Sequence, residues 1–455
     1  MTEVQRLARF VYGSNYEKLS SRAIVSLKLR LLDSLGCALG ALDGTPVKII
    51  RKQIKEFGGN PLTTLIGGGM TAPDRAAFYN SALVRYLDFN DSYLARKETC
   101  HPSDNIGSML AVAEYAGRSG KDFLTALAIA YQVQCRLSDE APVRDKGFDH
   151  TVQGSYGVAA GAAYALGLDE ARTAHAIAIA GTAYNALRVT RTGNLSHWKG
   201  LAFPSTGWTS THAAFLAMNG ITGPQEVFEG NKGFMESIAG DFTIDWSSED
   251  LEKVTQTIIK RYNAEIHSQA TLEGVQELHS AHSFYPEEVE KIVLRTFDVA
   301  YNIIGGGEEG GKKNISTKEE ADHSLPYLIA VMLLDGNVLP SQYLPERIIR
   351  EDVQQLLQKV EVYEKKEYSD RFPKEMPCDI TVALKGGSAL RVNKSDYEGF
   401  VTRPASWEMV ESKFRNLSSG CMDTPFQDRI IDMVKNIENY EVRDLMHVLG
   451  MIGAR

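Results

Sequence analysis

Apolar residues recur at helical spacing from the N-terminal region up to Ala264. In the segment SSRAIVSLKLRLLDSLGCALGAL, a serine suited to capping precedes apolar residues on one helical face, at Ile24, Leu27, Leu31 and Leu35. Other segments, such as GVAAGAAYALGL, are rich in alanine and glycine. Because helices that are small and apolar on most faces are usually buried on most faces, the pattern predicts a large, layered, all-helical body.

The pattern changes near Glu287. The segments EKIVLRTF and VEVYEKKE alternate apolar and polar residues, as strands do. The segment CDITVALKGGSALRV alternates on both sides of Gly386 and Gly387, which predicts a hairpin that turns at the two glycines. Between these strands, HSLPYLIAVMLLDGNV predicts a helix that ends at Gly336. Together these segments predict an α+β domain.

The C-terminal segment returns to a helical pattern. The runs RPASWEMVESKFRNL and PFQDRIIDMVKNIENY have the spacing of amphipathic helices, and we expect them to pack on the N-terminal helical body. The predicted fold is therefore mainly α. It has a large all-α helical domain built from both chain ends, residues 1–267 and 400–455, and a smaller α+β domain of residues 268–399 inserted between them.

Composition and charge narrow the class of protein. The 455 residues are 43% hydrophobic and 24% charged, as in an ordinary globular protein. The net charge of −9 argues against nucleic acid or an anionic membrane as a partner, because either would require a basic face. Five scattered cysteines without a CxxC pair indicate reduced thiols, and the longest apolar run is too short to span a bilayer. We expect a soluble, cytoplasmic protein.

Several familiar catalytic motifs are missing from the sequence. It contains no GxxxxGK(S/T) phosphate loop, no GxSxG nucleophile elbow and no HExxH zinc motif. The glycine clusters IGGGM and IIGGGEEGGKK lack the context of a dinucleotide site, and the ten histidines lack metal-ligand spacing. The sequence therefore predicts no cofactor and no metal site.

What remains is a set of polar clusters, each at a boundary between apolar segments. The densest is YLDFNDSYLARKETCHPSDN, which carries Asp88, Asp91, Ser92 and His101. One interpretation is a loop that ends one helix and caps the next through Ser103 or Asp104. The other interpretation is a site that handles protons.

Four further clusters follow along the chain. They are GFDHTVQGS with His150, RVTRTGNLSHWKG with Arg188, Arg191 and Lys199, KRYNAEIHSQ with Lys260 and His267, and DHSLPY with Tyr327. Each has a simpler interpretation, as a helix cap, a solvated basic loop or a charged linker. The third cluster, however, lies where the helical body meets the α+β domain, and such a junction is a usual place for a ligand cleft.

Taken together, the clusters resemble a known family. RYLDFNDSYL followed by HPSDNIGSMLAVAEY is similar, nearly residue for residue, to the signature of the iron-independent 2-methylcitrate dehydratases of the MmgE/PrpD family. LLDSLGCALGAL, GFDH, AEIHSQ, DHSLPYLIAVMLLDG and RPASWEMVESKF resemble the same family in the same order. The likeness covers essentially the whole chain. It implies that the α+β domain is an inserted lid, that the protein is a homodimer, and that catalysis uses no metal or organic cofactor.

The resemblance also implies where the site lies. Carried over to this sequence, the active-site positions are Asp88, Ser92, His101, His150, Lys199, Lys260 and Tyr327, with His267 close by. The implied reaction makes or breaks a carbanion beside a carboxylate of a small polycarboxylic acid, and without a metal the protein must supply positive charge there. The available cations are Lys199, Lys260, Arg188 and Arg191. The residues expected to bind substrate are Ser92, Arg188, Arg191, Lys260 and His267.

Proton transfer in this reaction requires a base and an acid. His101 is the first choice for one role, with Asp88 or Asp91 orienting it. His150 or Tyr327 is the candidate that protonates the departing hydroxyl group. The sequence leaves open which group is base and which is acid.

The expected activity is that of a carbon–oxygen lyase that dehydrates a tricarboxylic acid, such as 2-methylcitrate to 2-methyl-cis-aconitate. Two departures from the family pattern leave the acid itself open: the loop with Arg188 and Arg191 is short, and Asn263 stands where a proline is usual. The alternatives are a cis-aconitate decarboxylase, an epimerase or isomerase of a related polycarboxylate, and a helical protein that binds a metabolite without catalysis.

Overall fold

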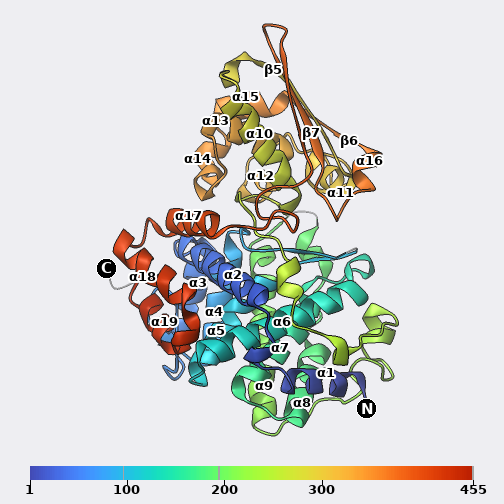
Figure 1. Ribbon diagram of the computed structural model, residues 1–455, viewed down its shortest axis with the longest axis vertical. Helices are drawn as coiled ribbons and strands as arrows, with labels where there is room; N and C mark the ends of the chain where they lie inside the picture. Colours follow the sequence, from blue (N-terminus) through green and yellow to red (C-terminus); the bar gives the residue numbers. More distant parts are fainter. Residues whose placement is uncertain (96, 193–194, 453–455) are drawn as a thin grey trace. The chain divides into compact units, whose positions relative to one another are not determined.

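The computed structural model describes residues 1–95, 97–192 and 195–452, and most of these residues are helical (Figure 1). The described strands form one four-stranded mixed sheet and two short two-stranded ladders. The prediction of a mainly helical chain with a small mixed sheet is therefore confirmed.

The chain divides into two compact units. The first contains Met1–Arg191, Leu195–Ile259 and the C-terminal segment from Trp407, and the second is built on Lys260–Ser406. The sequence-based domain limits at 267/268 and 399/400 stay predictions, and so does the role of the second unit as a lid.

Closely packed helices form the core of the first unit. In chain order its N-terminal helices are α1 (Glu3–Tyr12), α2 (Ser21–Gly40), α3 (Thr45–Phe57), α4 (Pro73–Tyr86), α5 (Ile106–Tyr115), α6 (Gly120–Glu140), α7 (Thr151–Leu166), α8 (Glu170–Ala183) and α9 (Trp198–Met218). Helix α7 is buried along almost its whole length. A Cβ atom at Gly161 would lie 2.6 Å from Met109 Sδ and 2.8 Å from the Ala126 carbonyl oxygen. Only glycine allows neighbouring helices this close, which explains the Ala- and Gly-rich sequence of α7.

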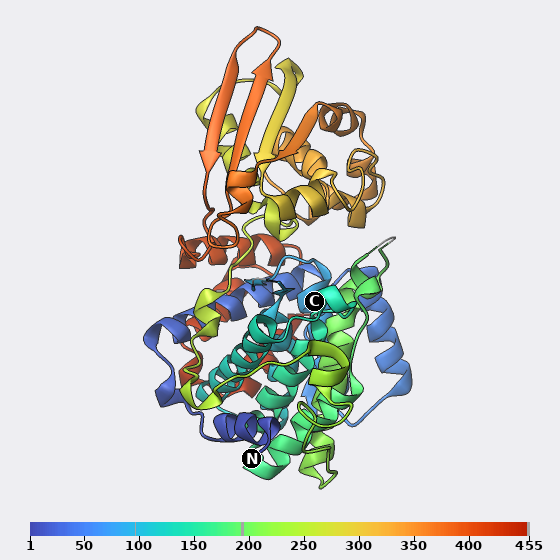
Figure 2. The same ribbon diagram turned by 90° about the vertical axis from the view of Figure 1, so that its right-hand side faces the viewer.

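The second unit contains the mixed sheet (Figure 2). Its strands are β5 (Val289–Thr296), β6 (Val360–Glu364), β7 (Cys378–Leu384) and β8 (Ala389–Lys394), in the order β6-β5-β7-β8. Strand β5 is parallel to β6 and antiparallel to β7, and β7 pairs antiparallel with β8. The predicted hairpin is confirmed, and Gly387 takes a φ of 82° in its turn. The helices of this unit are α10 (Gln269–Ala281), α13 (Leu325–Asp335) and α15 (Glu351–Gln358), with the short α11 (Asp298–Ala300), α12 (Lys318–Ala321), α14 (Pro345–Ile348) and α16 (Lys366–Ser369).

The C-terminal helices belong to the first unit. They are α17 (Trp407–Ser418), α18 (Thr424–Lys435) and α19 (Val442–Gly450). Helix α17 packs on α2 (Figure 1), and a Cβ atom at Gly36 would lie 3.1 Å from Phe414 Cα. The two ends of the chain therefore share one packed core.

A buried ion pair joins α17 to α2. Lys413 Nζ lies 2.7 Å from Asp33 Oδ1, and the two side chains are 4% and 0% exposed. The same ammonium donates a hydrogen bond of 2.6 Å to the carbonyl oxygen of Phe89, in the loop that follows α4. Lys413 therefore fixes this loop from a helix more than 300 residues away in sequence.

None of the helices within the described residues combines the length and the apolar character needed to cross a membrane.

Lys413→Met tests the contribution of this ion pair to stability. We expect it to lower the free energy of unfolding by about 3–5 kcal/mol, because it leaves Asp33 buried without a counter-ion. The measurement is urea denaturation, with Lys232→Met as the control. Lys232 pairs with Glu236 on the surface, and such pairs contribute about 0–1 kcal/mol. Equal losses in the two variants would contradict the prediction.

Candidate active site

The loop between α4 and α5 carries most of the predicted site residues. Asp88 follows α4 with a left-handed φ of 52°, a conformation that few residues other than glycine adopt. After Ser92 the chain forms the short ladder of β3 (Tyr93–Leu94) and β4 (Thr99–Cys100), and then a 3-10 turn, η2 (Pro102–Asn105). The Ser92 amide and carbonyl exchange hydrogen bonds of 2.9 and 2.8 Å with Ile258. The loop is therefore irregular but anchored.

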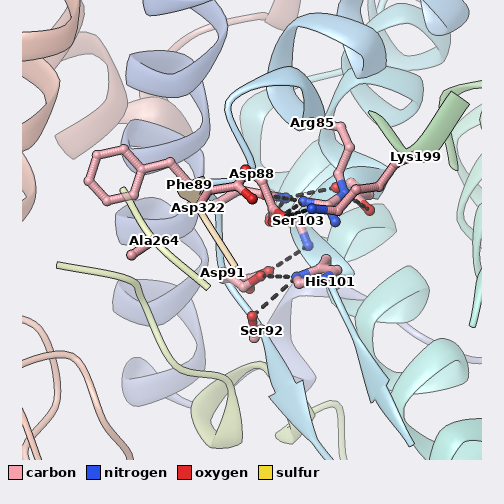
Figure 3. Close-up of polar contacts among 12 residues, drawn as sticks. Arg85, Asp88, Phe89, Asp91, Ser92, His101, Ser103, Lys199, Ala264 and Asp322 are labelled. Atoms are coloured by element: carbon pink, nitrogen blue, oxygen red, sulfur yellow. Dashed lines mark hydrogen bonds and ion pairs between the residues drawn. The ribbon is translucent and has the colours of Figure 1, made fainter. Parts of the chain in front are cut away.

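His101 is held in one orientation by this loop (Figure 3). Its Nδ1 lies 2.8 Å from the carbonyl oxygen of Asp91 and 3.1 Å from Ser92 Oγ. A carbonyl oxygen can only accept a hydrogen bond, so Nδ1 carries a proton and donates a hydrogen bond to the carbonyl oxygen of Asp91. In the neutral ring, Nε2 then holds the lone pair. His101 is thus a side chain with 9% exposure whose tautomer suits a general base.

The carboxylate of Asp91 serves the loop itself. Its Oδ1 accepts a hydrogen bond of 2.9 Å from the Ser103 amide, and its Oδ2 accepts one of 2.9 Å from the Tyr131 hydroxyl. Asp91 therefore orients His101 through its main-chain carbonyl rather than through its carboxylate. No sequence pattern indicates this role, because a sequence identifies side chains and not the directions of carbonyl groups.

Asp88 lies between two cations. It forms a short ion pair with Arg85, and its Oδ2 lies 3.4 Å from Lys199 Nζ. Arg85 is 2% exposed and its Nε also lies 3.6 Å from Asp104 Oδ2. The expected site residues Asp88 and Lys199 are therefore brought together, as parts of a longer chain of charges.

His150 forms a second buried group with Asp149 and Arg191. Arg191 Nε lies 2.8 Å from Asp149 Oδ2, and its terminal nitrogens lie 3.1 Å from His150 Nε2 and 2.9 Å from the Lys199 carbonyl oxygen. A guanidinium can only donate, so His150 Nε2 accepts and the ring is neutral. The rings of His150 and His101 meet edge to face, with centroids 5.3 Å apart.

Burial and positive neighbours set the charge of this group. Burial lowers the pKa of His150 to about 3; Asp149 opposes the shift and Arg191 adds to it. Burial alone would raise the pKa of Asp149, but Arg191 and its neighbours outweigh burial and hold that pKa below its usual range. His150 is therefore a neutral hydrogen-bonding group in the unliganded site, while Asp149 is ionised beside Arg191.

Arg188 shares a 3-10 turn, η4 (Arg188–Arg191), with Arg191. Burial and the nearby Arg144 lower its pKa, while Asp149 and Glu98 partly compensate. Arg188 is therefore electrostatically coupled to the Asp149 group, and its part in substrate binding stays a prediction.

The remaining predicted residues belong to the second unit. Lys260 is 1% exposed. His267 Nδ1 lies 2.6 Å from Glu265 Oε1, and its ring packs against Phe297 and Phe372. The hydroxyl group of Tyr327 donates a hydrogen bond to the Gln342 carbonyl oxygen. Their part in the site stays a prediction.

Two buried residues of the charge chain were not predicted from the sequence. They are Arg85, near the end of α4, and Asp104, which was considered only as a helix cap. The one signal for Arg85 is its place directly after the apolar run Ala82–Val84. Among the described residues, no three His, Cys, Asp or Glu side chains group as a metal site would require.

A buried imidazole beside paired cations is an arrangement that suits proton transfer on an anionic substrate. Comparison with known families agrees with this interpretation. The MmgE/PrpD N-terminal domain matches residues 5–247, and the MmgE/PrpD C-terminal domain matches residues 262–439. The chain belongs to the MmgE/PrpD family, as predicted.

Individual relatives carry two different activities in their names. The chain is 28% identical to the cis-aconitate decarboxylase of Homo sapiens, over 96% of this chain and 92% of that protein. It is also 28% identical to the 2-methylcitrate dehydratase of Salmonella typhi, over 93% of this chain and 91% of that protein. The 2-methylcitrate dehydratase of Escherichia coli K12 is 29% identical, over 73% of this chain and 71% of that protein. Both activities are lyase activities, so the prediction of a lyase is confirmed at the level of the enzyme class.

The charge state of His150 can be measured directly. We expect its ring to stay neutral from about pH 5 upward, where an unperturbed histidine would titrate. Arg191→Gln should raise the pKa of His150, because it removes a neighbouring cation that disfavours the imidazolium. The measurement is NMR of the histidine side chains over pH, with the His150 signals assigned by their loss in His150→Gln. A titration of His150 near neutral pH in the unaltered protein would contradict the expectation.

Proposed function

We propose that this protein is a lyase that dehydrates a small tricarboxylic acid, such as 2-methylcitrate, by acid–base catalysis with its own side chains. The observation that supports acid–base catalysis most directly is the hydrogen bond from His101 Nδ1 to the Asp91 carbonyl, which fixes the ring so that Nε2 is the nitrogen that exchanges a proton with substrate. In the proposed step, His101 takes a proton from the carbon next to a carboxylate. The electron pair of that C–H bond forms the carbon–carbon double bond, and the hydroxyl group leaves with a proton as water.

Positive charge is needed where the carbanion develops. A polycarboxylate substrate is already anionic, and proton abstraction adds a further charge that spreads onto the adjacent carboxylate. Lys199 pairs with Asp88 and Arg191 contacts His150. Both cations are largely buried, so they act in a medium where charge is poorly screened. Arg191 also suits bidentate pairing with a substrate carboxylate, which a lysine does not.

His150 fits a supporting role. A neutral imidazole beside Arg191 can donate a hydrogen bond through Nδ1, which has no hydrogen-bond partner among the described residues. Such a donor orients the departing hydroxyl group or a carboxylate oxygen. The hydrogen bond from the neutral ring strengthens when its acceptor is anionic, so His150 orients the arriving polyanion without a change in its own charge.

The alternative function is the decarboxylation of cis-aconitate. It is supported by the human decarboxylase, which matches this chain as well as the Salmonella typhi dehydratase does. Loss of carbon dioxide also leaves a carbanion that needs nearby positive charge, but it then requires a proton for carbon instead of a base. An epimerisation or isomerisation would use the same two groups in succession.

An assay of substrates distinguishes these functions. Purified, chelator-treated protein is incubated separately with 2-methylcitrate, citrate and cis-aconitate, and products are identified by NMR together with carbon dioxide release. We expect an unsaturated tricarboxylate from 2-methylcitrate. Release of carbon dioxide from cis-aconitate would establish the alternative, and loss of activity on chelation would contradict the metal-free mechanism. No product from any acid would favour a protein that binds a metabolite without catalysis.

The homodimer implied by the family resemblance is also part of this proposal. Light scattering coupled to size-exclusion chromatography measures the mass directly, and a mass of one chain would contradict it.

His101→Gln tests the proposed base. We expect kcat to fall by about 10²–10⁴-fold, because the amide cannot take the proton that Nε2 accepts. The control is His212→Gln, a half-exposed histidine on α9 that pairs with Asp74 away from the loop. Circular dichroism checks that both variants fold. If His101→Gln keeps activity within a few-fold of the unaltered protein, another group is the base.

A further inference from the structure

The carboxyl group of Asp104 is buried with too few hydrogen bonds. The residue is fully buried in η2, and its Oδ1 accepts a hydrogen bond of 2.7 Å from Asn90. Within the described residues, neither Asp104 Oδ2 nor Arg85 Nε makes a hydrogen bond, although the two atoms lie 3.6 Å apart. Asp91, which is equally buried, has a hydrogen bond to each carboxylate oxygen. The negative charge of an ionised Asp104 is therefore poorly stabilised by its hydrogen bonds.

Arg85, the cation nearest to Asp104, is shared with a second carboxylate. Arg85 forms its closer ion pair with Asp88, and Asp88 in turn contacts Lys199. These four residues carry two positive and two negative charges, so the chain of charges is neutral when all are ionised. A bound polycarboxylate adds negative charge at Lys199. The excess negative charge is then least well stabilised on Asp104, the member of this chain that is most buried and has the fewest hydrogen bonds.

We propose that binding of a polycarboxylate in this site is coupled to the uptake of one proton by Asp104, so that its carboxyl group is neutral in the complex. The proton comes from solvent and is placed on the carboxylate oxygen that faces Arg85, and no bond of the substrate changes. This inference rests on the proposed function, because it requires a polyanionic ligand at Lys199. Asp104 acts on the charge of the site and is a positioning residue that does not touch the ligand.

The electrostatic environment of Asp104 agrees with the proposed proton uptake. Burial raises the pKa of Asp104 to about 7; Arg85 and Asn90 oppose the shift, and Asp91 adds to it. A modest further rise in the pKa of Asp104, caused by the negative charge of the ligand, therefore protonates the carboxyl group at neutral pH. The charged or titratable groups on the elements packed around η2 include Arg30 and Asp33 of α2, Arg85 of α4, Asp88, Asp91 and His101 of the loop, Tyr131 of α6, Asp149 and His150 before α7, Arg191 of η4 and Lys199 of α9.

The histidine beside this cluster is a less favourable site for that proton. His150 Nε2 already accepts a hydrogen bond from Arg191, so protonating it would set two positive groups 3.1 Å apart. A proton on Asp104 instead removes a buried charge and breaks no hydrogen bond, because Asn90 donates to the other oxygen.

Binding of a substrate analogue over pH tests the coupling. The probe is propane-1,2,3-tricarboxylate, which has no hydroxyl group to eliminate. Above about pH 7 its carboxyl groups are ionised, and the Kd for the unaltered protein should rise by up to about tenfold per pH unit as Asp104 loses its proton in the free protein. Asp104→Asn keeps the shape of the side chain and removes its charge. The plot of log Kd against pH should therefore be shallower for this variant, by up to about one unit per pH unit, which corresponds to one proton.

Calorimetry counts the protons independently. Titrations in buffers of different ionisation enthalpy should show up to one proton taken up per site by the unaltered protein and correspondingly fewer by Asp104→Asn. The matched control is Asp33→Asn, which alters a buried carboxylate that already has Lys413 at 2.7 Å. Its proton uptake should equal that of the unaltered protein. Equal uptake by Asp104→Asn and the unaltered protein would overturn the proposal.

Two outcomes need no variant. Binding of the probe by the unaltered protein without proton uptake, or without a new protonated-carboxyl band in the infrared difference spectrum, overturns the coupling and leaves the proposed function intact. Failure of the probe to bind at all contradicts the polycarboxylate substrate class, and the coupling falls with it.

Discussion

Arg85 and Lys199 are two cations that the protein must keep largely out of water before any anionic substrate arrives. A buried cation without a partner costs several kcal/mol, and Asp88 removes that cost by lying between the two. Asp88 also adopts the left-handed conformation that ends α4 and starts the loop. Glycine would make this turn with less strain but would bring no charge. One residue therefore both pairs with the two cations and sets the path of the chain.

The loop after Asp88 can be irregular because distant elements satisfy its polar groups. A segment outside helices and sheets leaves its amides and carbonyls without regular partners, and each one buried without a bond costs free energy. Lys413 of α17 binds the Phe89 carbonyl, and Ile258 pairs with Ser92. Tyr131 of α6 holds the Asp91 carboxylate. The orientation of His101 thus depends on contacts from several parts of the first unit, including the C-terminal helix α17.

The sequence predicted the parts of this protein that depend on repeated local patterns. Helical periodicity, the hairpin at Gly387 and the clustering of proton-handling residues from Asp88 to His101 were all visible in it. The direction of the Asp91 carbonyl was not, since it depends on the three-dimensional path of the loop. Arg85 was missed for a related reason: a single arginine in a helix usually marks a solvated face, and only packing shows that this one is buried. The place of Lys260, His267 and Tyr327 relative to His101 stays a prediction.

The proposed site suits dehydration and decarboxylation alike, because in the proposed mechanisms both reactions pass through a carbanion beside a carboxylate. They differ in the proton that His101 holds at the start. Dehydration needs the Nε2 lone pair, whereas decarboxylation needs a proton to deliver to carbon. The hydrogen bond from Nδ1 to the Asp91 carbonyl exists in either state, so the position of the ring does not choose between the reactions. Under the proposed mechanism, the choice falls to the number of protons in the loaded site, which we propose that buried groups such as Asp104 and His150 control without touching the reacting carbon. This argument fits the finding that relatives of the same similarity are named for both reactions.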